Sequence, residues 1–300
     1  MVSSMKIIKR WVTIVLFCGI SALNAYSLDM GAMFNIGNLA FQPTRVASDT
    51  TFAGTYYPWG LSVYGSQQIS DTMLVNTGYY SDTVLRNIAY STITYQGDYF
   101  SLGAGPLLGV FNSKSAPLTP GIIATVRVQI PGIVYLAYGS DSTLGASLVQ
   151  VGDYLQQQSS VSLGFYIPNA IASANILTKK YTEKTSAGDS IDQLTLYSFQ
   201  TDIFQKNVPY RVLLTFGYQT LSKTFLESTT TTAQLGSIIV GTRVEFHVTN
   251  FLTLVADLNS SVYTFGQESL VGLSNPGPNG YLFQLQTGAQ ISLDNLFQSR

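Results

Sequence analysis

The segment Tyr281–Leu293 has the sequence YLFQLQTGAQISL, and its residues alternate between two chemical classes. Apolar residues occupy the odd positions, with Thr287 as the polar exception. Polar or small residues occupy the even positions from Gln284 to Ser292. Successive side chains of a strand point to opposite faces, so this segment predicts a strand with one apolar and one polar face.

The same alternation recurs through the chain after residue 27, in segments separated by turns rich in Asp, Asn, Gly and Pro. We therefore predict fourteen strands, within a range of 12 to 16. The predicted strands are 28–40, 57–69, 72–81, 85–96, 99–112, 121–130, 133–139, 159–167, 170–182, 192–204, 210–222, 235–248, 252–265 and 281–293.

The connections between these strands alternate in length. The short ones are 70–71, 97–98, 131–132, 168–169, 205–209 and 249–251. The long ones are 41–56, 113–120, 140–158, 183–191, 223–234 and 266–280, and 82–84 is short as well. A barrel inserted from one side of a membrane has short turns at one end and long loops at the other. We therefore predict an all-β, transmembrane, antiparallel up-and-down barrel, with a soluble secreted sandwich as the rival.

Segment 140–158 leaves three interpretations open: a loop folded into the lumen, a short helix, or two further strands. It is our candidate for a constriction of the lumen.

The composition favours a surface that faces lipid. Only 10% of residues are charged, against about 25% in soluble domains, while Tyr and Phe number 19 and 16. Aromatic residues lie at predicted strand ends, where interfacial girdles belong. They include Tyr56, Tyr57, Trp59, Tyr79, Tyr80, Tyr95, Tyr99, Phe100, Phe251, Tyr263 and Phe265. The sequence lacks the excess of basic residues that is typical of nucleic-acid-binding proteins.

Residues 1–27 have the layout of a cleaved secretory signal. Lys6, Lys9 and Arg10 precede the apolar segment 11–22, and cleavage is expected after Ala25 or Ser27. A retained anchor is the alternative. Cleavage would leave a single barrel domain, 28–300. It would also remove Cys18, the only cysteine, so disulfides, thiolate chemistry and cysteine-ligated metals are not expected.

Five charged residues fall on the polar face of predicted strands and are candidates for the pore lining. An arginine or lysine facing the middle of the lipid costs about 2–4 kcal/mol, so these side chains are expected to point into the lumen. They are Arg127, Arg211, Arg243, Glu245 and Asp257. Two interpretations stay open: a mixed-charge pore with weak ion preference, or ion pairs that fill a narrow, closed barrel.

The sequence offers little for catalysis. His247 is the only histidine and lies on a polar strand face near a predicted turn. Gly103-Ala104-Gly105, followed by Pro106, fits a strand with small residues toward the lumen better than a nucleotide-binding loop. We expect no enzyme activity, no catalytic residues, no cofactor and no metal site.

The final strand resembles the C-terminal assembly signal of transmembrane β-barrels, through Gln286, Gly288, Ile291 and Leu293. Such barrels commonly end on Phe or Trp, whereas this chain continues to Arg300. In size and strand count the chain resembles compact, plug-less, monomeric porins of bacterial outer membranes. The fatty-acid transporter barrels carry an additional N-terminal hatch, for which this chain has no room.

The resemblance implies residence in the outer membrane of a double-membrane bacterium, with lipid and the β-barrel assembly machinery as partners. It also implies passive diffusion of small polar solutes, as a monomer or a trimer. A transporter of hydrophobic substrates and a closed structural or adhesive barrel acting through its loops are the alternatives.

Overall fold

The computed structural model describes residues 28–37, 59–81, 87–113, 116–146, 153–185, 188–205, 208–226, 230–266 and 283–293. Its strands are β1 (Leu28–Gly37), β2 (Trp59–Ser70), β3 (Met73–Ser81), β4 (Asn87–Gln96), β5 (Phe100–Ser113), β6 (Ala116–Ile130), β7 (Val134–Thr143), β8 (Gly145–Ala146), β9 (Asp153–Ile167), β10 (Ala170–Thr185), β11 (Gly188–Phe204), β12 (Tyr210–Leu226), β13 (Thr230–His247), β14 (Leu252–Gly266) and β15 (Phe283–Ser292).

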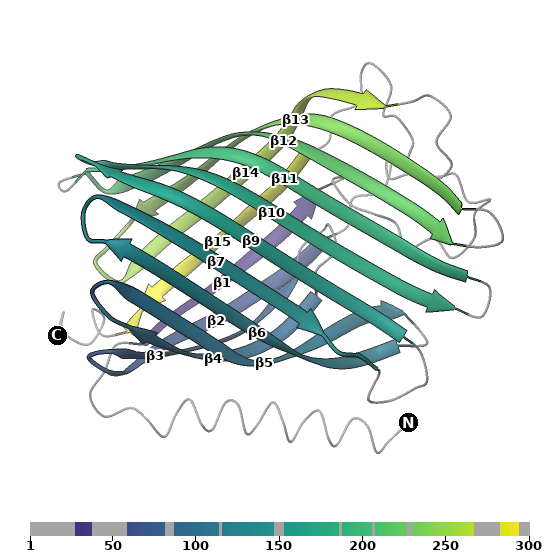
Figure 1. The fold of residues 1–300 in the computed structure, drawn as a ribbon. Coiled ribbons are helices and arrows are strands. Elements are labelled where there is room, and N and C mark those ends of the chain that lie inside the picture. The colour runs from purple at the N-terminus through teal and green to yellow at the C-terminus, as the bar shows by residue number, and fades with distance from the viewer. Residues whose placement is uncertain are drawn as a thin grey trace.

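The strands form one closed antiparallel barrel (Figure 1). Each strand pairs with its neighbour in sequence, and β1 closes the barrel by pairing with β15 as well as with β2. Among the described residues, the two-residue β8 pairs only with β9, while β7 also pairs with β9, so fourteen strands build the wall. This confirms the predicted fold class and strand number and excludes the sandwich.

Two of the predicted short turns carry residues with positive φ. Gly132 has φ 73° and follows Pro131, and Asn169 has φ 60° and follows Pro168. Proline fixes φ near −65° at the second position of a turn, and Gly or Asn tolerates positive φ at the third. Ile133 N–H donates to Ile130 O at 3.0 Å and closes the first of these turns.

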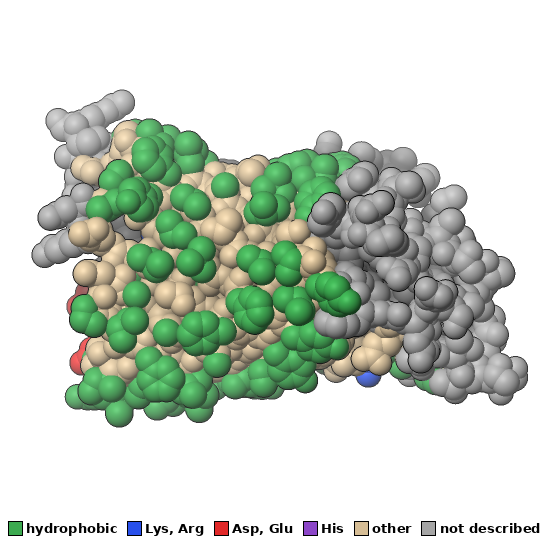
Figure 2. Space-filling view, turned by 90° about the horizontal axis from the view of Figure 1, so that it is seen from above, with side chains coloured by type: hydrophobic (Ala, Val, Ile, Leu, Met, Phe, Trp, Pro, Cys, Tyr) green, Lys and Arg blue, Asp and Glu red, His purple; other side chains and the backbone are tan. Residues whose placement is uncertain are grey.

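The outer face carries an apolar band that ends before the strands do. On β12 the outward side chains are apolar or aromatic from Tyr210 to Tyr218 and become polar at Thr220. The eight residue steps from Tyr210 to Tyr218 span about 26 Å of strand, or about 20 Å of height at a tilt of about 40°, close to the band of outer-membrane barrels. Figure 2 shows hydrophobic side chains across one side of the barrel, with charged ones only at its margins.

Several predicted loops are in fact strand. Segment 140–158 supplies the end of β7, all of β8 and the start of β9, and 183–191 and 223–234 are largely taken up by β10–β13. Segment 113–120 likewise belongs mostly to β5 and β6. The prediction ended each strand where apolar alternation stopped, but backbone pairing continues above the apolar band, where both faces are polar. The lumenal-loop and helix interpretations of 140–158 are therefore wrong for its described residues.

Glycine allows close strand approach at Gly105. A Cβ there would fall on the backbone carbonyl oxygen of Ser91. The following Pro106 has no N–H, and the β4–β5 pairing skips from Ile93↔Ala104 to Tyr90↔Leu107. The predicted strand with small residues toward the lumen is therefore present here.

Some predictions fall outside the described residues. These include the signal at 1–27, the loops at 41–56 and 267–280, and the aromatic residues Tyr56 and Tyr57. Within the part of the chain that the structure describes, no helix is long and apolar enough to cross a membrane.

Trp59 offers a test of the lipid-facing surface. Its side chain is 70% exposed and stacks on Phe34 on the outer face, with ring centroids 6.2 Å apart. After removal of residues 1–27 it would be the only tryptophan, because the other is Trp11. We expect lipids with brominated acyl chains to quench its fluorescence in proteoliposomes. Quenching by aqueous iodide instead would contradict a lipid-facing position.

Gly105→Ala should lower the free energy of unfolding by about 1–3 kcal/mol, because the added methyl group meets rigid backbone. Gly65→Ala is the matched control, since its Cβ would lie 3.8 Å from Asp29 O and 4.0 Å from Thr77 Cγ2. Urea titration followed by heat-modifiable gel mobility measures both. Equal stability of the two variants would refute the close approach at Gly105.

Candidate functional site

All five charged residues predicted for the pore lining occupy inward-facing positions near the short turns. Arg127 lies near the end of β6, Arg211 near the start of β12, and Asp257 near the start of β14. Arg243 and Glu245 lie near the end of β13. Their strand neighbours on either side, such as Val244 and Phe246, point outward and are exposed. The side of the lumen at the short turns is therefore the charged one.

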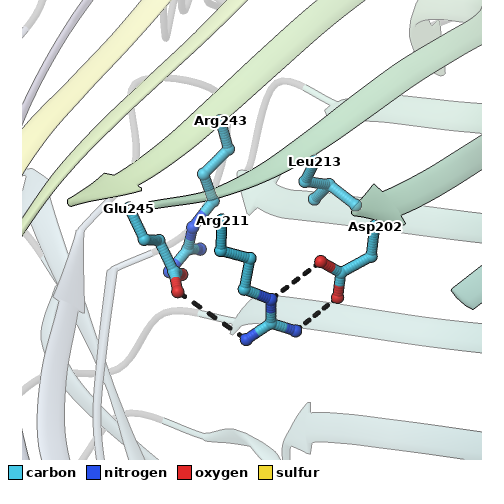
Figure 3. A pocket seen from close by; sticks show the side chains of 5 residues that line it. All are labelled: Asp202, Arg211, Leu213, Arg243 and Glu245. Atoms are coloured by element: carbon cyan, nitrogen blue, oxygen red, sulfur yellow. Dashed lines mark hydrogen bonds and ion pairs between the residues drawn. The ribbon is translucent and has the colours of Figure 1, made fainter. Parts of the chain in front are cut away.

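Four of the inward charges form a continuous chain of contacts across β11, β12 and β13 (Figure 3). Arg211 binds Asp202 through two nitrogens, with Nε donating to Oδ1 at 2.7 Å. Arg211 Nη1 lies 3.6 Å from Glu245 Oε2, and Arg243 Nη2 lies 2.6 Å from Glu245 Oε1. A planar guanidinium matches a carboxylate in this two-point geometry.

Asp257 on β14 lies next to this chain of contacts. It lies directly opposite Arg243 in the antiparallel register, and Asn259 Nδ2 donates to its Oδ1 at 2.8 Å. We call Asp202, Arg211, Glu245, Arg243 and Asp257 the ion-pair row. Signs alternate along it, so each charge has an opposite neighbour and the row holds two positive and three negative charges.

The ion-pair row borders a small cavity. The cavity measures about 220 Å³ and is lined by Leu213 together with four residues of the row, Asp202, Arg211, Arg243 and Glu245. The Arg211 side chain is 45% exposed, whereas Asp202 and Glu245 are 14% exposed. The arginine thus remains accessible from the lumen while its carboxylate partners lie against the wall.

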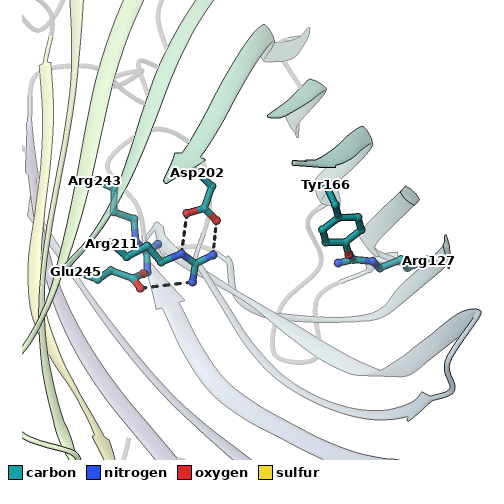
Figure 4. Close-up of polar contacts among 6 residues, drawn as sticks. All are labelled: Arg127, Tyr166, Asp202, Arg211, Arg243 and Glu245. Carbon is teal, nitrogen blue, oxygen red and sulfur yellow. Dashed lines mark hydrogen bonds and ion pairs between the residues drawn. The ribbon is translucent and has the colours of Figure 1, made fainter. Parts of the chain in front are cut away.

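Arg127 stands apart from the row, on the other side of β10 (Figure 4). Its Nη2 donates to the Tyr166 hydroxyl, and its guanidinium carbon lies 4.0 Å from the centre of the Tyr135 ring. Of the three arginines that the structure describes, Arg127 alone has no acidic partner among the described residues.

His247 makes a local contact. Its Nδ1 lies 2.8 Å from Thr253 Oγ1 on the adjacent strand, at the exposed short-turn end. Among the described residues, no group of three His, Cys, Asp or Glu side chains is placed to hold a metal ion.

Toward the opposite end of the barrel, inward side chains are buried on nearly every strand. Ile88 is 0%, Leu221 1% and Gln219 3% exposed. An eight-stranded barrel is filled by its own side chains, whereas a fourteen-stranded barrel is wider and has room for water in its lumen. Large inward side chains would therefore be exposed to water unless other groups covered them. We call these residues the buried belt: Asn35, Ser62, Ile88, Leu107, Thr119, Asp141, Gln156, Lys179, Leu194, Gln219, Leu221, Ser237 and Ser261.

Hydrogen bonds made by side chains of the buried belt join strands that are not neighbours. Asn87 N–H on β4 donates to Gln156 Oε1 on β9 at 3.4 Å, although β5, β6 and β7 separate these strands in the wall. Asn35 Nδ2 on β1 likewise donates to Ser81 O on β3 and to Ser62 Oγ at 3.2 Å. The belt therefore narrows the lumen, and Gln156 comes from the segment predicted as a constriction.

The predicted assembly-signal residues lie on or next to β15. Gln286 and Gly288 face inward, Ile291 faces outward and is 39% exposed, and Leu293 directly follows the strand. Gly288 pairs with Met33 on one side and Val255 on the other, and a Cβ there would strike the backbone of β1. The glycine thus permits tight pairing at the seam that closes the barrel.

Two residues of the site, Asp202 and Gln156, were not predicted from the sequence. Asp202 occupies the same parity as Ser198 and Gln200 on its strand, so alternation alone could have placed it in the lumen. Gln156 lies beyond the apolar band, where no alternation marks its direction.

The sequence matches no protein-family model, and no curated protein matches it significantly. Solved structures of bacterial outer-membrane barrels are similar in fold. An outer membrane channel from Pseudomonas putida F1 has a TM-score of 0.47 at 8% identity, covering 89% of this chain and 96% of that one. A loop-deletion mutant of OmpT, an outer membrane protein of Vibrio cholerae, has a TM-score of 0.44 at 10% identity, covering 89% and 99%. An anion-selective porin from Comamonas acidovorans has a TM-score of 0.39 at 8% identity, covering 89% of this chain.

Glu245→Gln should lower the free energy of unfolding by about 1–2 kcal/mol, because two arginines lose a charged partner on the wall. Asp71→Asn, an acid-to-amide change in an exposed short turn, is the control and should change it by less than about 0.5 kcal/mol. Urea unfolding of the detergent-folded barrel measures both. If the two variants are equally stable, the row contributes nothing to stability.

Proposed function

We propose that this barrel is an outer-membrane channel for passive diffusion of small polar solutes. The observation that carries the proposal is the division of side chains across the wall. The outer face is apolar, whereas the inner face near the short turns carries ion pairs, amides and hydroxyls. Inward polar groups of this kind can replace part of the hydration of a passing solute.

Passage through such a channel would occur in two stages. A solute entering from the short-turn side meets the ion-pair row, whose charges are nearly balanced and attract neither sign strongly. It then meets the buried belt, which limits passage by width. No proton transfer or bond cleavage is needed, so we propose that the barrel has no catalytic activity.

The location follows from the same division of side chains. A closed barrel pairs its backbone internally and can present apolar side chains to lipid, as an outer-membrane protein must. We propose export through the signal at 1–27 and insertion by the β-barrel assembly machinery, with Gln286, Gly288, Ile291 and Leu293 as its recognition strand.

A closed structural barrel is the second candidate, and the buried belt favours it. The belt residue Gln156 on β9 accepts a hydrogen bond from Asn87 N–H on β4 across the lumen, and large inward side chains are almost fully buried. If these contacts never open, no solute passes and the barrel acts through its surface. The two candidates share one fold and differ in conductance.

Single-channel recording distinguishes the two candidates. We expect the refolded mature chain, checked by heat-modifiable mobility, to give discrete conductance steps in planar bilayers. The steps should be small because the belt narrows the lumen. A folded barrel that gives no steps would reject the channel and support the closed barrel.

Gln156→Ala should raise the single-channel conductance about two-fold or more, because it removes the side chain that reaches Asn87 across the lumen. Gln158→Ala is the matched control, since Gln158 is also inward-facing and less buried. It should leave the conductance nearly unchanged. An equal effect of the two substitutions would show that the cross-lumen contact does not limit passage.

A further inference from the structure

Arg127 is held by aromatic groups on the two strands that follow β6 in the wall. Tyr135 on β7 presents its ring face to the guanidinium at 4.0 Å, and Tyr166 on β9 accepts a hydrogen bond from Nη2. The two rings meet edge to face, with centroids 5.8 Å apart. A cation over an aromatic face is attracted by the ring quadrupole, but its formal charge is not neutralised.

The aromatic support is itself fixed in place. Tyr135 lies over Gly164, its partner in the antiparallel register, and a Cβ at Gly164 would fall within the Tyr135 ring. The Tyr166 hydroxyl donates to Gln129 Oε1 at 3.3 Å, and Gln129 Nε2 donates to Asp98 O at 2.9 Å. Asp98 takes part through its backbone carbonyl oxygen. The guanidinium therefore has a fixed position before any ligand arrives.

Arg127 differs from the arginines of the ion-pair row in what remains for a ligand. Arg211 contacts two carboxylates and Arg243 contacts one and faces another. Arg127 uses a single Nη2 N–H in its bond to Tyr166 and contacts no carboxylate among the described residues. A guanidinium has five N–H donors in a fork that suits carboxylate and phosphate oxygens.

We propose that Arg127, supported by Tyr135 and Tyr166, is a binding site for a small oxyanion such as phosphate or a carboxylate. The site lies near the short turns and takes its ligand from that side of the lumen. Its role in transport, as a subsite that favours anionic solutes, rests on the proposed channel function. The binding itself does not require an open pore.

Chemical modification tests the binding directly. The detergent-folded protein is treated with phenylglyoxal, which reacts with guanidinium groups, and chymotryptic peptides are quantified by mass spectrometry. We expect Arg127 to react faster than Arg211 and Arg243. Inorganic phosphate at ten times its Kd should slow modification of Arg127 by about eleven-fold and leave the other two unchanged. The two row arginines are controls within the same molecule.

A variant that keeps the charge tests the aromatic support. Tyr135→Leu retains Arg127 but removes the ring beneath it, so phosphate protection should weaken several-fold. Acetate should protect to a lesser extent than phosphate, and neutral glycerol should not protect. Equal protection of all three arginines, or none at Arg127, overturns the proposal.

Recording of chloride currents separates this proposal from the channel proposal. Phosphate added on the short-turn side should reduce the current through the unmodified barrel and through Arg211→Gln, but not through Arg127→Gln. A conducting barrel without phosphate protection at Arg127 rejects the oxyanion site and keeps the channel. Phosphate protection in a barrel that never conducts keeps the site and rejects the channel.

Discussion

Every backbone N–H and C=O within hydrocarbon must be paired, and this requirement governs the whole architecture. An open sheet would leave two unpaired edges, so the chain closes on itself through nine residue pairs between β1 and β15, from Asp29↔Ser292 to Gly37↔Gln284. Closure in turn gives each strand one face for lipid and one for the lumen. The apolar band, the ion-pair row and the buried belt are all consequences of that division.

The inner face is divided along the barrel axis as well. Ion pairs gather near the short turns, where Arg211 and Glu245 can exchange contacts with water, while Ile88 and Leu221 lie in the buried belt. A charged pair that keeps access to water avoids most of the desolvation cost that a buried pair would incur. The charged side chains therefore lie at the short-turn end, where water reaches them, and the buried belt lies toward the opposite end of the barrel. It also leaves Arg127, held by aromatic rings, chemically distinct from the neutralised arginines.

Alternation of side chains was sufficient to predict the barrel, its fourteen strands, its short turns and the inward direction of Arg127, Arg211, Arg243, Glu245 and Asp257. It worked because one face of each strand must be apolar within lipid. The strand ends opposite the short turns could not be predicted this way, because beyond the apolar band Gln157 and Gln158 look no different from loop residues. The contact between Gln156 and Asn87 was equally hidden, since it depends on how the closed wall brings distant strands together.

The seam between β1 and β15 has a consequence for how the chain is made. Its two partners stand at opposite ends of the sequence, so the first strand must wait for the last before its outer edge is paired. Joining ends so far apart carries the largest loop-closure entropy of any strand pairing in the wall. The outer edge of β1 therefore stays unpaired until the last strand has been made. Until β15 pairs with β1, the solubility of the unclosed sheet depends on whatever covers that edge.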